Sequence, residues 1–209
     1  MYGLVNKAVE DLVKGQFGPA AWEQIQKEAG LHIPCFVSME AYPDEITFRL
    51  VAATSKVLGI PAEWMLESFG RHWILFTAAE GYGCMLDLCG LTLRDFLLNL
   101  HTLHTRVELM FSHLKPPSFV CRELGDGAIE VNYHSHRAGL EPMMKGLLEG
   151  LGERFKTLVQ VEHTQRRADG ANHDVFVVRE TASSATIGGV SSAGPTTQAV
   201  SAPKCPHAS

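Results

Sequence analysis

The stretch SFVCRELGDGAIEVNYHSHR, residues 118–137, marks the point where the sequence changes from a helical period to a strand period. SFVCRE and AIEVNYHSHR are separated by a Gly-Asp-Gly turn, and Ile129, Val131 and Tyr133 alternate with polar residues in the second run. Two such runs on either side of a glycine turn are typical of a β-hairpin. We therefore expect an antiparallel sheet to begin at this point of the chain.

Two further elements and a tail are predicted on the C-terminal side of this hairpin. TLVQVEH (residues 157–163) and DVFVVRE (residues 174–180) flank ADGANH and predict a second hairpin. Residues 140–155 predict a helix with Pro142 in its first turn. Residues 181–209 are small, polar and without an apolar period, so they predict a disordered tail outside a domain of residues 1–180.

The N-terminal half is helical in its pattern. Apolar residues recur at steps of three and four, and prolines and glycines mark the ends of the runs. The predicted helices are residues 4–17, 19–29, 43–58, 61–73 and 92 to about 114, the last of them with a capping box at Thr92 and Asp95. The fold class is therefore α+β, with a helical N-terminal subdomain followed by a four-stranded antiparallel sheet and a crossing helix.

Composition excludes several classes of function. The 209 residues carry a formal charge of −5 and no cluster of Lys and Arg, which argues against binding to nucleic acid. The sequence has no apolar run of about 20 residues, and its N-terminus carries acids where a signal peptide needs basic residues, so we expect a cytoplasmic protein without a membrane span. Five cysteines without paired CxxC motifs favour reduced thiols.

Two histidines, His101 and His104, lie in NLHTLHTRVEL (residues 99–109). Position 104 continues the apolar series of this helix, so His104 is expected to face the core, whereas His101 is expected to face water. A single histidine on an apolar face is more often a core residue than a metal ligand, and the spacing alone leaves both interpretations open. A buried neutral imidazole would also suit a haem iron or another transition metal, and neighbouring leucines such as Leu100 and Leu103 would form a dry wall for a flat apolar cofactor.

The end of the first hairpin predicts an anion site. A strand through residues 128–137 would place Tyr133, Ser135 and Arg137 on one face, where two hydroxyls and a guanidinium can converge. Arginine binds a carboxylate through two charge-assisted hydrogen bonds. The alternative is a solvated strand face, but Ile129 and Val131 continue the same side and indicate that it is covered.

These features together resemble the H-NOX family, the haem domain of soluble guanylate cyclase and of bacterial nitric oxide and oxygen sensors. The resemblance rests on the core histidine of NLHTLH, followed about 30 residues later by Tyr-x-Ser-x-Arg in YHSHRAGL. It extends over most of residues 1–180, and includes MYGLVNKA at the start, LVAATSKVLG (residues 50–59), EGYG (residues 80–83) and PPSF (residues 116–119).

The resemblance implies a haem b cofactor that lies between the helices and the sheet. His104 matches the axial ligand of the haem iron, and Tyr133, Ser135 and Arg137 match the motif that binds the two haem propionates. Pro117 matches the proline that presses on the macrocycle in the family. The residues that match the walls over the distal haem face are Val5, Trp73, Met143 and Leu147, which could equally be ordinary core residues.

The resemblance also implies a ligand and an output. Family members that hold oxygen place a tyrosine hydroxyl over the iron, and the matching residue here is Met143, so we expect nitric oxide and carbon monoxide to bind and oxygen to be excluded. Trp73 is the other candidate donor, through its indole N–H. Nitric oxide weakens the iron–histidine bond in the family, and the resulting relaxation would signal to a separate partner, such as a histidine kinase or a cyclic-nucleotide enzyme.

Two other classes of function compete with a sensor. A haem-dependent enzyme, such as a peroxidase or a dioxygenase, would use the same cofactor, but the expected distal wall has no His and Arg pair for acid–base work on a peroxide. Within the sensor class, an oxygen-binding haem sensor is the alternative. In a domain without haem, His104 would be a core residue and Arg137 would form a structural ion pair. The visible spectrum of the purified protein separates a haem sensor from a domain without haem, and turnover of peroxide would favour an enzyme.

Overall fold

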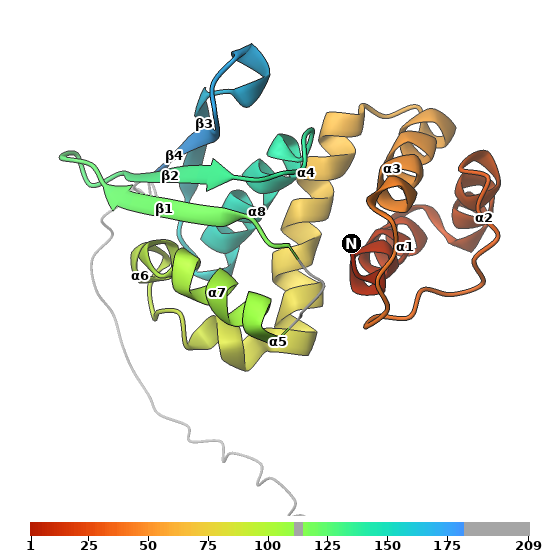
Figure 1. Ribbon diagram of the computed structural model, residues 1–209, viewed down its shortest axis with the longest axis horizontal. Coiled ribbons are helices and arrows are strands. Elements are labelled where there is room, and N and C mark those ends of the chain that lie inside the picture. The colour runs from red at the N-terminus through yellow and green to blue at the C-terminus, as the bar shows by residue number, and fades with distance from the viewer. Residues whose placement is uncertain (111–114, 182–209) are drawn as a thin grey trace, which may run out of the picture.

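The computed structural model describes residues 1–110 and 115–181, and it has the predicted α+β architecture (Figure 1). The predicted tail beyond Thr181 lies outside the described residues. The N-terminal helices are α1 (Gly3–Phe17), α2 (Pro19–Glu28), α3 (Asp44–Leu58) and α4 (Ala62–His72). The later helices are η1 (Trp73–Thr77), α5 (Ala78–Asp87), α6 (Leu93–Leu98), α7 (Leu100–Met110), α8 (Glu141–Arg154) and the short turn η2 (Arg167–Asp169).

Local chemistry explains the ends of the first helices, which were predicted to within a few residues. Gly18 separates α1 from α2 with a φ of 84°, and Pro19 then begins α2 with the fixed φ that a first turn requires. Gly59 ends α3 in the left-handed region at a φ of 66°, and its N–H donates to the carbonyl of Ser55. Among the described residues, no helix is both long and apolar enough to cross a membrane.

The middle of the chain differs from the prediction in two places. The helix that begins after Pro61 does not end at Trp73 but continues through the π-helical segment η1 into α5. The helix predicted from Thr92 is divided at Asn99, whose side-chain amide donates to the carbonyl of Cys89 at 3.0 Å. Its predicted last turn, residues 111–114, lies outside the described residues. The capping box is confirmed, because the Thr92 hydroxyl accepts from the N–H of Asp95.

The four strands form one antiparallel sheet. They are β1 (Ser118–Glu123), β2 (Ile129–His134), β3 (Val159–Gln165) and β4 (Asp174–Glu180), in the order β1-β2-β4-β3. The strand predicted to reach Arg137 ends at His134. Its two neighbours explain this end, because β1 begins opposite His134 after two prolines, and β4 begins opposite Tyr133.

Two hydrophobic clusters form the core. One lies among α1 to α4, with Ile25 and Leu50 fully buried, and the other lies between the sheet and α6 to α8, with Leu148 and Phe176 fully buried. Trp73 contacts both clusters. In Figure 1 the helices α1 to α3 lie on one side of α4, and the sheet with α8 lies on the other.

Helices α4 and α8 cross at a distance that only glycine permits. A Cβ atom at Gly146 of α8 would overlap the carbonyl of Glu67, and one at Gly70 of α4 would overlap the carbonyl of Met143. Lys145 of α8 donates to Glu67 at 2.9 Å along the same contact. This close packing fixes the sheet side of the molecule to the long α4 segment.

Candidate functional site

A mostly apolar cavity of about 290 Å³ lies where the two clusters meet. Helices α1, α3 and α4 supply one side, and α7, α8 and the ends of β1 and β2 supply the other. Every site residue predicted from the sequence lines this cavity: Val5, Trp73, Leu100, Leu103, His104, Pro117, Tyr133, Ser135, Arg137, Met143 and Leu147. The fold thus brings together residues that are spread over most of the described chain.

The imidazole of His104 is held in one neutral tautomer by its own helix. Its Nδ1 lies 2.9 Å from the carbonyl oxygen of Leu100, one turn earlier on α7. Because a carbonyl can only accept, Nδ1 carries the proton and the lone pair lies on Nε2. Burial lowers the pKa of His104, and the hydrogen bond to Leu100 offsets this only in part, so the ring is neutral near pH 7. His101 is exposed, as predicted.

Aromatic and aliphatic side chains surround this imidazole. The ring of Phe119 in β1 lies 4.6 Å from the His104 ring, centroid to centroid, and Tyr133 lies 5.6 Å from Phe119. Leu100 and Leu103 of α7 are buried. A dry wall of this kind favours a flat apolar ligand over a hydrated one.

The Tyr-x-Ser-x-Arg motif is held by its own hydrogen bonds. Tyr133 is buried in β2, and burial raises the pKa of its hydroxyl, which also bonds the side chain of Ser135. The hydroxyl of Ser135 accepts from the backbone N–H of Arg137 at 3.1 Å. Because β2 ends at His134, Ser135 and Arg137 reach the cavity from a loop rather than from the strand face that the sequence predicts.

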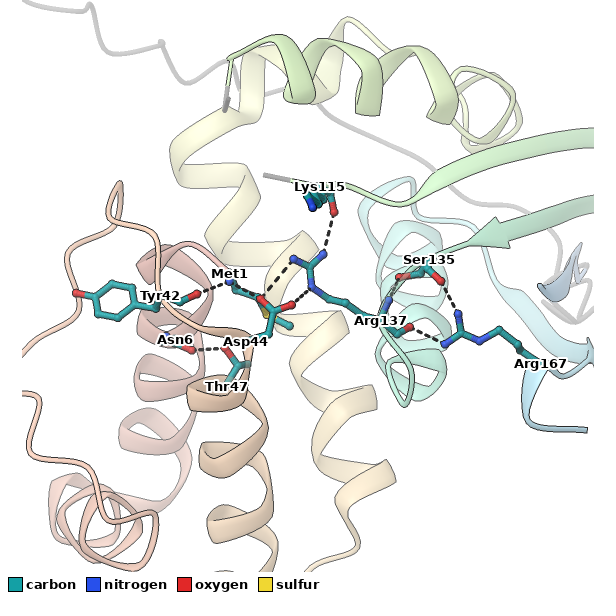
Figure 2. A network of polar contacts seen from close by, with 9 residues as sticks. All are labelled: Met1, Asn6, Tyr42, Asp44, Thr47, Lys115, Ser135, Arg137 and Arg167. Carbon is teal, nitrogen blue, oxygen red and sulfur yellow. Dashed lines mark hydrogen bonds and ion pairs between the residues drawn. The ribbon is translucent and has the colours of Figure 1, made fainter. Parts of the chain in front are cut away.

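Arg137 binds a carboxylate that the sequence analysis missed. Its Nε donates to Asp44 at the start of α3 at 2.7 Å, and its Nη1 donates to the carbonyl of Lys115 at 2.9 Å (Figure 2). The amino group of Met1 also donates to Asp44, at 2.5 Å. Burial raises the pKa of Asp44, but the hydrogen bonds from Arg137 and the amino group outweigh it, and the pKa is lowered. No local sequence signal distinguishes Asp44 from the neighbouring Glu45.

The cavity lining contains two tyrosines that were not predicted as site residues. Val5, Trp73, Met143 and Leu147 line the cavity, and Tyr2 and Tyr82 line it as well. Tyr82 lies at a break in α5, where its φ of −137° and ψ of 20° depart from helical values. Such a break follows no periodicity rule, which is why a helix pattern could not place Tyr82 in the cavity.

The donor set fits an iron porphyrin. A neutral imidazole offers a nitrogen lone pair, the walls are apolar, and the guanidinium of Arg137 lies at the edge. Among the described residues Arg137 uses three of its five N–H groups, toward Asp44 and Lys115, so two remain for a further carboxylate. The residues therefore suit a flat cofactor with a metal at its centre and acids at one edge.

Comparisons with known proteins agree with this geometry. The family model described as Haem-NO-binding matches residues 2–163. Soluble guanylate cyclase gcy-35 of Caenorhabditis elegans is 30% identical over 189 residues, which are 86% of this chain and 28% of the relative. Soluble guanylate cyclase gcy-37 of the same organism is 28% identical over 187 residues, 85% of this chain and 26% of the relative. The chain spans less than a third of the length of either relative.

Solved structures share the fold. An H-NOX protein from S. oneidensis in the Fe(II)NO ligation state superimposes with a TM-score of 0.80 at 21% identity, over 87% of this chain and 100% of that chain. A Cs H-NOX mutant superimposes with a TM-score of 0.77 at 22% identity, over 87% of this chain and 97% of that chain. The arrangement of helices and sheet is therefore the same in all three.

Proposed function

Because the chain belongs to the haem-NO-binding family, a family of haem-based gas sensors, we propose that this protein binds haem b and senses nitric oxide. His104 would be the axial ligand of the iron, and Tyr133, Ser135 and Arg137 would bind the propionates. The observation that carries the proposal is the hydrogen bond from Nδ1 of His104 to the Leu100 carbonyl, since it leaves Nε2 available to a metal ion. The haem, when bound, supplies the gas-binding iron.

The chain's own residues set the environment of that iron. Leu100 and Leu103 are buried and line the cavity from the same helix as His104, and Pro117 lines it from the segment that precedes β1. Arg137 is held by Asp44 of α3, so a shift at the cofactor edge would be felt by the N-terminal helices. The protein would transmit this shift to a separate partner, such as a histidine kinase or a cyclic-nucleotide enzyme, from the cytoplasm.

Met143 is the residue of the cavity lining that supports binding of nitric oxide and carbon monoxide over oxygen. Met143 of α8 lines the cavity and offers no hydrogen-bond donor to a bound gas. Bound oxygen takes up negative charge and needs such a donor, whereas nitric oxide does not depend on one. Excluding oxygen would let the protein respond to nitric oxide in air.

The presence of Tyr82 in the lining favours one alternative, an oxygen-binding sensor. If its hydroxyl donated to bound oxygen, the reduced protein would form a stable oxygen complex that Tyr82→Phe abolishes. A haem-dependent enzyme is less well supported. Among the described residues that line the cavity, the only histidine is His104 and the only arginine is Arg137, and the proposal assigns both to haem binding.

Visible spectra test the proposal. The reduced protein should show one broad visible band in air, and nitric oxide should produce the Soret band of five-coordinate nitrosyl haem. His104→Gly should lose most of its pigment and regain it with added imidazole, while His101→Gly, the exposed control on the same helix, should stay pigmented. A His104→Gly protein that is as pigmented as the parent and does not respond to imidazole would contradict the proposal.

A further inference from the structure

The side chain of Arg167 lies against the backbone of the loop that carries Arg137. Arg167 begins the turn η2 between β3 and β4. Its Nη1 donates to the carbonyl of Ser135, and its Nη2 donates to the carbonyl of Arg137 at 2.9 Å (Figure 2). One guanidinium therefore holds the two carbonyls that flank His136.

These two carbonyls lie just beyond the end of the sheet. The last residue of β2 with a partner in β4 is Tyr133, opposite Asp174, and the last with a partner in β1 is His134, opposite Ser118. Neither neighbouring strand reaches Ser135 or Arg137, so strand pairing leaves their carbonyls without donors. The guanidinium of Arg167 supplies the donors instead, in the planar fork that suits two acceptors at a fixed spacing.

Arg167 is itself firmly placed. Its backbone N–H donates to the Asp174 carboxylate at 2.9 Å, and Nε2 of His163 lies 3.0 Å from the same oxygen. Asp174 is 2% exposed, and the ring of His163 stacks on Phe176 in the core. The neighbouring Arg166 is exposed, whereas Arg167 is partly buried. The contact with the loop thus begins from a turn that is attached to the sheet through the buried carboxylate of Asp174.

We propose that Arg167 is a positioning residue for Arg137, and this rests on the proposed function of the site. Holding the carbonyls of Ser135 and Arg137, while the Ser135 hydroxyl accepts from the N–H of Arg137, fixes the direction in which the Arg137 side chain leaves the backbone. A guanidinium held in place before binding loses less entropy when it binds the carboxylates of the cofactor. Arg167 thereby slows the release of haem without contacting it.

Transfer of haem to an excess of a haem-scavenging apoprotein tests this. We expect Arg167→Met to release haem roughly tenfold faster than the parent, as the loss of hydrogen bonds from a charged donor implies. Arg166→Met, the exposed neighbour, should release haem at the parental rate. In an Arg137→Met background the change at Arg167 should add less than about twofold, because its effect passes through Arg137. Equal acceleration in both backgrounds, or none in either, would overturn the proposal.

Hydrogen–deuterium exchange on the same purified proteins separates this proposal from that of haem binding. Peptides covering residues 135–139 should exchange roughly tenfold faster in Arg167→Met, while those covering Ile129–Tyr133 stay as in the parent. Unchanged exchange overturns the proposal whether or not the protein binds haem. Faster exchange with unchanged haem release also overturns it, because Arg167 would then only stabilise the loop. Should Arg167→Met fail to fold, Arg167→Lys, which can reach one carbonyl, is expected to release haem and to exchange the amides of residues 135–139 about threefold faster than the parent. Parental rates in Arg167→Lys would then overturn the proposal.

Discussion

The carboxylate of Asp44 lies 2.7 Å from Nε of Arg137, and this ion pair joins the first turn of α3 to the loop after β2. The side chain of Arg137 is 13% exposed and that of Asp44 is 30% exposed, so water screens the pair only in part. The amino group of Met1 binds the same carboxylate. Three segments far apart in the chain therefore meet at one side chain beside the cavity.

Asp44→Asn is expected to lower the free energy of unfolding by about 1–2 kcal/mol at pH 7, because it removes the charge that Arg137 and the amino group share. Urea unfolding of the purified proteins measures this. Glu45→Gln is the matched control in the same helical turn, is exposed, and should change stability by less than about 0.5 kcal/mol. Equal stability of both variants and the parent would show that the pair contributes nothing.

The contribution of Asp44 should depend on pH in one direction. Its pKa is lowered in the folded protein, so the contribution is complete above the pKa of the unfolded chain and disappears as the pH falls through the folded value. The stability difference between the parent and Asp44→Asn should therefore be constant from about pH 7 to pH 5 and shrink toward pH 3. A difference that grew on acidification would contradict this assignment.

Met143→Tyr is expected to let the reduced protein hold oxygen. The side chain lines the cavity from α8, and a hydroxyl there can donate to bound oxygen. A charge-assisted hydrogen bond of this kind is worth about ten- to a hundredfold in affinity. Oxygen titration of the reduced protein measures the change, with Met143→Phe as the control that adds an aromatic ring but no donor. If both variants bound oxygen equally, ring shape rather than hydrogen bonding would set the affinity.

Gly146→Ala should destabilise the protein by about 2 kcal/mol or more, because the new methyl group would overlap the backbone of Glu67 where α8 crosses α4. Gly15→Ala tests the opposite case, since nothing lies within 4 Å of a Cβ at that position of α1. Gly15→Ala should stabilise the protein by up to about 1 kcal/mol, because alanine has a higher helix propensity than glycine. Thermal unfolding of the two variants compares them, and a neutral Gly146→Ala would mean that the helices can separate at no cost.

Periodicity predicted the architecture because most elements obey local rules. Gly18, Gly59 and the capping box at Thr92 end or begin helices through contacts within a few residues, which a sequence displays directly. Asn99 is an exception. It divides the helix predicted from Thr92, and its side-chain amide donates to the carbonyl of Cys89 ten residues earlier. A helix pattern cannot anticipate a contact of that kind.

The residues of the candidate site fall into the same two groups, those that a local pattern predicts and those that a distant contact places. His104 was predicted from its place in an apolar series on one helix, which is local information. The pairing of Arg137 with Asp44, 93 residues earlier, depends on how the helical part packs against the sheet. Arg167 was missed for a related reason, because only the early end of β2 at His134 leaves backbone carbonyls for it to bind.

The π-helical segment Trp73–Thr77 determines which side of the following helix, α5, faces the cavity. A π-turn accommodates one residue more than an α-turn, and an α-helix turns by about 100° per residue. Because a π-turn takes up one residue more in the same rotation, winding these same five residues as an α-helix would swing everything after them around the axis by about that angle. Ala78 and Tyr82, which line the cavity from α5, would then face elsewhere, although every residue of α5 would still be present.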